Sequence, residues 1–176
     1  MPSLSCTSMT SSAPPPWTNQ PLVLYHGTLD IHVAAILTAV DPLRGRRDAD
    51  FGIGFYTTTL EEQAFRWAER LAWHRVGVSP AVIRFEVDRD IFASLDCLWF
   101  VRGSRDATDF WSFVTHCRTG GSQHGRRAPG GWYDVVIGPV AASWRRRLAQ
   151  PRSDQVSFHT ERAAHLLDAS TSWRVL

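Results

Sequence analysis

Segments with strand and helix patterns alternate irregularly along this chain, and their order constrains the fold more than any other feature. Alternating or apolar runs rich in β-branched and aromatic residues predict strands over 21–28, 51–59, 81–89, 132–142 and 154–160. Apolar residues at helical spacing predict helices over 31–40, 60–77, 106–118 and 161–170. We expect Asp30 to cap the first helix and the first strand to end in a turn. Because regular strand–helix–strand units are missing from this order, an α+β fold is favoured over a doubly wound sheet.

We expect one folded domain over residues 21–176 and a disordered tail over residues 1–20. A chain of 176 residues falls in the size range of a single domain and can bury a real core. The first part is rich in Ser, Thr and Pro and almost uncharged, so it buries too little apolar surface to order itself. A leader of this kind can also be a non-cleaved export signal of an injected effector.

The composition favours a cytoplasmic protein with no membrane segment and no metal. No apolar run approaches the ~20 residues that a bilayer span requires, and the N-terminus lacks the basic start and apolar core of a secretory signal. Cys6, Cys97 and Cys117 are widely spaced and odd in number, which disfavours a disulfide framework or a zinc knuckle. The histidines lack the H-E-x-x-H spacing of zinc hydrolases.

The close glycines Gly52 and Gly54 do not fit a phosphate-binding loop. They precede a predicted strand, whereas Rossmann glycines follow a strand and open a helix. The sequence also lacks G-x-x-x-x-G-K-[ST] and G-x-S-x-G. These absences disfavour a P-loop enzyme, a Rossmann dehydrogenase and an α/β-hydrolase.

The chain contains no lysine, and its arginines cluster at 44–47, 126–127 and 145–147. A formal charge of +2 is too small to indicate nucleic-acid binding by itself. The planar guanidinium suits phosphates, but clusters of this kind also occur as solvated surface. Nucleic-acid binding by the clusters and the loop 119–131 therefore stays an alternative, and it predicts a strongly salt-dependent affinity.

Side chains at three places could carry chemistry. His26 can offer a ring nitrogen while the backbone of Gly27 approaches a ligand closely. Tyr56 and Trp67 follow eleven residues apart, on a strand and the next helix, where two rings can hold a flat ligand between them. Gln155 lies near the start of the late strand. Each place also has a purely structural interpretation: His26 can cap a turn, Tyr56 and Trp67 can fill the core, and Gln155 can lie at a strand edge.

Taken together and in this order, these places resemble the ADP-ribosyltransferase superfamily, in its diphtheria-toxin-like half. The resemblance covers roughly Pro21 to Leu167 and rests on LYHGT (Leu24–Thr28), DFGIGFYTT (Asp50–Thr58), QAFRWA (Gln63–Ala68), YDVVIGPVA (Tyr133–Ala141) and DQVSFHT (Asp154–Thr160). It implies a split antiparallel β-sheet core with flanking helices. It also implies a His-Tyr-Glu site that binds NAD as a substrate.

The resemblance assigns a role to each residue of this site. His26 matches the histidine that bonds a ribose hydroxyl of the adenosine half, and the backbone of Gly27 matches the group that pairs with the nicotinamide amide. Tyr56 and Trp67 match aromatics on the two faces of nicotinamide. Gln155 takes the place of the glutamate. Further NAD contacts are expected from Thr28 and Arg46.

The expected function is NAD-dependent mono-ADP-ribosyl transfer by a toxin- or effector-type enzyme, with release of nicotinamide. The acceptor is open among a protein, a nucleic acid and a small molecule, and a toxin can be paired with a neutralising antitoxin protein. Gln155 is neutral and cannot supply charge or act as a base, and Asp154 is expected on the opposite face of the strand. The alternatives are therefore a non-catalytic NAD or ADP-ribose binding module and an NAD glycohydrolase. Phe51 and Phe55 are expected in the core.

Overall fold

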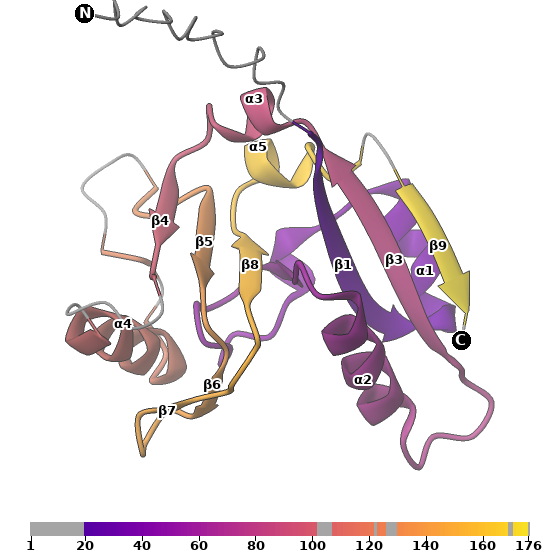
Figure 1. The fold of residues 1–176 in the computed structure, drawn as a ribbon, viewed down its shortest axis with the longest axis horizontal. Coiled ribbons are helices and arrows are strands. Elements are labelled where there is room, and N and C mark those ends of the chain that lie inside the picture. Colours follow the sequence, from indigo (N-terminus) through magenta and orange to yellow (C-terminus); the bar gives the residue numbers. More distant parts are fainter. Residues whose placement is uncertain (1–19, 102–106, 122, 126–129, 169–170, 176) are drawn as a thin grey trace, which may run out of the picture.

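The computed structural model describes residues 20–101, 107–121, 123–125, 130–168 and 171–175, with side chains up to residue 168. The predicted tail lies outside these ranges except for its last residue. Two main sheets and a small hairpin are combined with helices in an irregular order, so the predicted α+β class is confirmed. Figure 1 shows the two sheets standing side by side.

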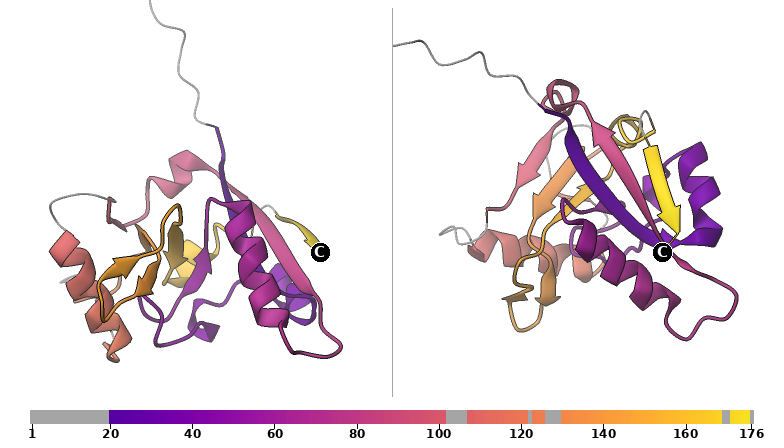
Figure 2. Two further views of the ribbon diagram at one scale, coloured as in Figure 1. Left: turned by 60° about the horizontal axis from the view of Figure 1, so that its bottom comes forward. Right: turned by 45° about the vertical axis from the view of Figure 1, so that its right-hand side comes forward.

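The first sheet has three antiparallel strands in the order β1 (Leu22–Leu29), β3 (Pro80–Val87) and β9 (Thr171–Val175). One face of this sheet buries Leu24, Ile83 and Phe85 beneath α1 (Asp30–Thr38). The other face is covered by α2 (Glu61–Ala72), whose buried Ala64 and Ala68 lie against β1 (Figure 2). Two small residues one turn apart let this helix approach the strand closely.

The second sheet has four strands in the order β2 (Phe55–Thr57), β8 (Gln155–Phe158), β5 (Val135–Gly138) and β4 (Cys97–Trp99). The β4–β5 pair is parallel and the other two pairs are antiparallel. The remaining elements are the 3₁₀ helix Pro42–Arg44, α3 (Arg89–Phe92), α4 (Ala107–Arg118), β6 (Ala141–Ser143), β7 (Leu148–Ala149) and α5 (Glu161–Ala164).

Alternation along the strands gives the four-stranded sheet two different faces. Phe55, Val156 and Phe158 belong to the core between the two sheets. Tyr56 and Val136 belong to a second core with Phe51 and with α4. Phe51 and Phe55 are therefore both buried, as predicted, but in different cores. Gln155 pairs with Gly138 and lies on the same face of the sheet as Tyr56.

Several predicted boundaries are wrong. The first strand agrees within one residue with the prediction of 21–28, but it does not end in a turn: it runs through Leu29 directly into α1 at Asp30. The predicted strand 132–142 is two strands, β5 and β6, because Pro139 has no N–H to continue the ladder. The predicted helix 161–170 is helical only over α5.

Two short strands and one cap also differ from the prediction. Strands β4 and β9 differ from the expectation because their apolar residues are too few to form a distinct pattern in the sequence. The N-cap of α1 is Leu29, and Asp30 is the first helical residue. The carboxylate of Asp30 instead accepts hydrogen bonds from the backbone of Ile31 and Ser79, which ties the helix start to the loop before β3.

Candidate functional site

The two sheets meet at a single antiparallel bridge, between Tyr25 in β1 and Thr58 just after β2. Each residue donates its N–H to the carbonyl of the other, at 2.8 and 2.9 Å. A continued ladder would next pair Gly27 with Tyr56, but the bridge is isolated and the two strands separate there. This separation point lies beside the predicted site residues His26, Gly27 and Tyr56.

The imidazole of His26 occupies the place where the ladder stops. Its Nδ1 lies 2.7 Å from the carbonyl oxygen of Tyr56, and its ring stacks on Phe55 at a centroid distance of 4.2 Å. A carbonyl can only accept, so Nδ1 carries the proton and donates. Burial lowers the pKa of His26 to about 4, which keeps the ring neutral at physiological pH. Nε2 is therefore left as a hydrogen-bond acceptor.

Gly27 directs its backbone groups toward the separated strand. The N–H and C=O of a strand residue point the same way as those of the residue two positions before it, and those of Tyr25 point at Thr58. The N–H and C=O of Gly27 therefore face β2, and no hydrogen bond joins them to β2 within the described ranges. A donor and an acceptor are presented side by side at this point.

Tyr56 is partly buried, and its hydroxyl is bonded to the loop that precedes β2. It donates to the carbonyl of Gly52 at 2.7 Å and accepts from the N–H of Phe51 at 3.0 Å. Burial raises the pKa of Tyr56 well above its usual value, so the phenol stays protonated. The hydroxyl thereby fixes the ring, and any ligand contact of Tyr56 would be through the ring face.

The same loop is held by two buried histidines. His124 Nε2 lies 2.9 Å from the carbonyl of Phe51, and His159 Nδ1 lies 2.7 Å from the carbonyl of Ile53. With Tyr56 on Gly52, three successive carbonyls each accept from a different side chain. The motif DFGIGFYTT therefore specifies a rigid support for Tyr56.

Trp67 lies on α2 one turn after Gln63 and is 44% exposed. Gln63 Nε2 donates to the carbonyl of Asp154 at 2.7 Å, and Gln63 Oε1 accepts from the backbone N–H of Asp154 at 3.2 Å. This amide therefore fastens the start of α2 to the residue before Gln155. The indole is an exposed aromatic surface on the helix that is anchored beside β8.

Gln155 is buried, and both N–H groups of its side-chain amide are engaged. Nε2 donates to Asp50 Oδ2 and to the carbonyl of Pro139, both at 2.9 Å. Asp50 is 3% exposed and also accepts from the N–H of Ala141 at 2.8 Å. Arg118 in α4 donates to Asp50 Oδ1 through Nε at 2.9 Å and Nη2 at 2.6 Å. A buried ion pair thus lies directly behind Gln155.

The two carboxylates that lie nearest to Gln155 among the described residues are both engaged by other groups. Asp154 turns the other way, as predicted, and accepts from the hydroxyls of Thr58 and Thr59 and from the N–H of Thr59. The carboxylate of Asp50 lies behind the Gln155 amide, paired with Arg118.

The two remaining predicted site residues, Thr28 and Arg46, have different surroundings. Thr28 follows Gly27 in β1 and is 5% exposed. Arg46 lies in an exposed turn and forms two hydrogen bonds with Asp48, at 2.8 and 3.0 Å. The structure therefore brings His26, Gly27 and Tyr56 together at one strand separation, with Gln155 and Trp67 on the adjoining elements, while the Arg46 guanidinium is paired with Asp48.

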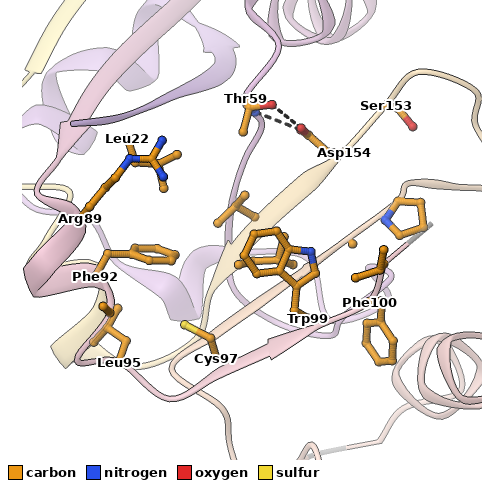
Figure 3. A pocket seen from close by; sticks show the side chains of 16 residues that line it. Leu22, Thr59, Arg89, Phe92, Leu95, Cys97, Trp99, Phe100, Ser153 and Asp154 are labelled. Carbon is orange, nitrogen blue, oxygen red and sulfur yellow. Dashed lines mark hydrogen bonds between the residues drawn. The ribbon is translucent and has the colours of Figure 1, made fainter. Parts of the chain in front are cut away.

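A separate cavity of about 610 Å³ lies on the other face of the four-stranded sheet (Figure 3). Phe92, Trp99 and Val156 form part of its apolar wall, and Thr59, Arg89 and Asp154 contribute polar groups. None of the predicted site residues lines it, since Gln155 points away from Asp154 and Val156. The cavity and the candidate site are on opposite sides of β8.

Sequence reasoning missed Asp50, Arg118 and Gln63 as supports of the site. Asp50 opens the motif DFGIGFYTT and Gln63 opens QAFRWA, so both lay within recognised motifs. Their partners, Gln155 and Asp154, are more than ninety residues away. No local pattern indicates such pairs.

Residues 22–148 match the model of a protein family described as "Protein of unknown function (DUF3990)". No curated protein and no solved structure matches the chain. Among the described helices, none is long and apolar enough to cross a membrane. Within the same residues, no group of three or more His, Cys, Asp or Glu side chains could hold a metal ion.

Proposed function

We propose that this chain, which belongs to the DUF3990 family, is an NAD-dependent mono-ADP-ribosyltransferase with its site at the separation of β1 and β2. The observation that carries the proposal is the set of groups at that point: a neutral His26 with Nε2 as acceptor, and the N–H and C=O of Gly27 facing the gap. A carboxamide needs one donor and one acceptor side by side, and a ribose hydroxyl needs an acceptor.

The aromatic residues support the same assignment. Tyr56 has a ring fixed through its hydroxyl, and Trp67 has an exposed indole on the neighbouring helix. Two rings of this kind suit a flat nicotinamide, which gains stacking energy without needing further polar partners. In this proposal the carboxamide pairs with Gly27, and His26 accepts from a hydroxyl of the adenosine ribose.

The proposed reaction breaks the bond between nicotinamide and C1′ of its ribose. Nicotinamide leaves with the bonding electrons, the acceptor's nucleophilic atom bonds to C1′, and the acceptor loses a proton. The transition state resembles an oxocarbenium ion, so the site's main tasks are to hold NAD in position and to exclude competing geometries. Because Gln155 is neutral, the proton must be taken by a second, basic group of the acceptor, by water or by another group of the protein.

Binding without catalysis is the second candidate, and the surroundings of Gln155 favour it over hydrolysis. Both amide protons of Gln155 are engaged by Asp50 and Pro139, and Asp154 faces the other side of the sheet. A site without a free carboxylate can bind NAD strongly and still leave it intact.

One experiment separates these candidates. Purified protein is titrated with NAD by calorimetry and then incubated with NAD, with and without cell extract, while free nicotinamide is measured. Transfer predicts binding and nicotinamide release that rises with extract, together with labelled ADP-ribose on an acceptor. Binding without release supports the binding module. If NAD does not bind at all, both candidates fail.

The exposed tryptophans of α2 provide a matched test of the stacking role. We expect Trp67→Ala to weaken NAD binding about tenfold, because one ring–ring contact is worth about 1 kcal/mol or slightly more. Trp73→Ala is the control, since Trp73 is 72% exposed and lies at the far end of the helix. Calorimetry with both variants checks this. Equal affinities for the two variants would remove Trp67 from the site.

A further inference from the structure

The orientation of the Gln155 amide is determined by its neighbours. The groups that face Nε2 are a carboxylate oxygen of Asp50 and the carbonyl oxygen of Pro139, each at 2.9 Å. Both can only accept. Turning the amide over would place Oε1 against two acceptors and leave three buried oxygens facing one another, which is strongly unfavourable. Nε2 therefore faces inward, and Oε1 faces the opposite side.

Asp50 is itself held by four donors, so it can act as a fixed support. Arg118 contributes two hydrogen bonds to Oδ1, and Ala141 and Gln155 each contribute one to Oδ2. The guanidinium of Arg118 offsets the charge of Asp50. The effect of Asp50 on the site is therefore mainly one of orientation, with a smaller polarisation of the amide through the hydrogen bond.

The outward oxygen is available to a ligand. No donor from the described residues reaches Gln155 Oε1, and this oxygen is not among their fully buried atoms without a hydrogen-bond partner. It lies on the same face of the sheet as Tyr56. A ligand group that meets it must be a donor, such as a sugar hydroxyl.

We propose that Asp50 is a positioning residue that holds Gln155 with Oε1 toward the ligand, where it accepts a hydrogen bond from the 2′-hydroxyl of the nicotinamide ribose. The ligand part of this inference rests on the proposed function. The chain thus uses a buried Asp–Arg pair to turn a neutral amide into an acceptor of fixed direction, in the place where the resembling enzymes have a glutamate.

The decisive experiment compares NAD with its analogue lacking that 2′-hydroxyl, by calorimetry on three proteins. The wild type is expected to bind NAD about tenfold more tightly than the analogue, since one neutral hydrogen bond is worth roughly that factor. In Asp50→Asn the side-chain nitrogen can take the place of Oδ2, where it cannot accept from Gln155 Nε2. Gln155 then loses one of its two inward partners and with it its fixed direction, so the ratio falls towards one. Asp48→Asn, a change in the same loop on an exposed carboxylate, should keep the wild-type ratio.

A merely structural role of Asp50 would weaken both ligands equally and leave the ratio unchanged, which would overturn the inference. Wild-type protein that binds neither ligand would refute the proposed function and the ligand assignment together. The orientation itself is decided without a ligand, by hydrogen exchange of the Gln155 side-chain amide in ¹⁵N-glutamine-labelled wild type. We expect it to exchange at least about tenfold more slowly than the exposed Gln20. Equal rates would contradict the fixed orientation of the Gln155 amide, and this test remains valid even if Asp50→Asn does not fold.

Discussion

Gly27→Ala is expected to destabilise the protein by about 3 kcal/mol or more. A Cβ at this position would lie 2.0 Å from the carbonyl oxygen of Ala64 and 3.2 Å from the N–H nitrogen of Ala68. These are backbone atoms of α2, so no side-chain rotation relieves the clash and the helix must move away from β1. Thermal unfolding should show a melting temperature lower by roughly 10 °C for a chain of this size.

Gly77→Ala is the control for this substitution, because it is the same change at a position where the new Cβ meets no neighbouring group. Gly77 has a φ of +78°, and no atom lies within 4 Å of its expected Cβ. Its replacement should cost only about 1 kcal/mol, from backbone strain alone. If Gly27→Ala were no more destabilising than Gly77→Ala, the close packing of α2 on β1 would be wrong. Any folded Gly27→Ala protein should also bind NAD more weakly, because the helix that shifts carries Trp67.

The sequence predicted the structure best where the residues that determine a feature lie close together in the chain. The stretch from Asp50 to Thr58 predicted two buried phenylalanines and a strand, and all three are present. The prediction that its glycines do not form a Rossmann phosphate-binding loop is also confirmed, since they precede the strand β2. The order of the segments was sufficient for the α+β class because helix and strand periodicities differ strongly.

The parts that could not be predicted depend on contacts between distant segments. The strand 21–28 was predicted with His26 inside it, but the turn expected at its end was wrong because the pairing of β1 with β3 extends the strand through Leu29. That pairing depends on residues 80–87, and the sequence of β1 contains no information about it. The same holds for Asp50, whose partners Arg118 and Gln155 come from α4 and β8.

The role of Tyr56 shows how a functional and a structural interpretation can both apply to one residue. Its hydroxyl supports the loop through Phe51 and Gly52, while its ring shares a face of the sheet with Gln155. A conservative Tyr56→Phe change would therefore disturb the loop without removing the ring. The aromatic pattern alone does not reveal this division between hydroxyl and ring.

Acid unfolding is expected to be driven by three buried histidines. Burial lowers the pKa of His26 and His124 to about 4 and that of His159 to about 3. In the unfolded chain all three have a pKa of about 6.5. Below that pH the unfolded state binds protons that the folded state does not, so the free energy of unfolding decreases as the pH falls.

The three histidines together give a steep dependence of stability on pH. Each contributes a slope of up to about 1.4 kcal/mol per pH unit between its two pKa values, so the sum approaches roughly 4 kcal/mol per unit between about pH 6 and pH 4. A domain with a typical stability of about 5–15 kcal/mol would then unfold near pH 4–5. Urea unfolding at a series of pH values measures this directly.

The exposed His74 is the control for this titration. His74→Asn keeps a residue that tolerates the local φ of +64°, and the steep dependence that arises from the three buried rings should persist in this variant. A stability that stays flat from pH 7 to about pH 4.5 would contradict the burial of the three rings.

The rings of His124 and His159 lie 4.4 Å apart, so charging both is especially unfavourable. They hold the loop on either side of Gly52, and we therefore expect acid to release the support of Tyr56 in the same transition that unfolds the chain.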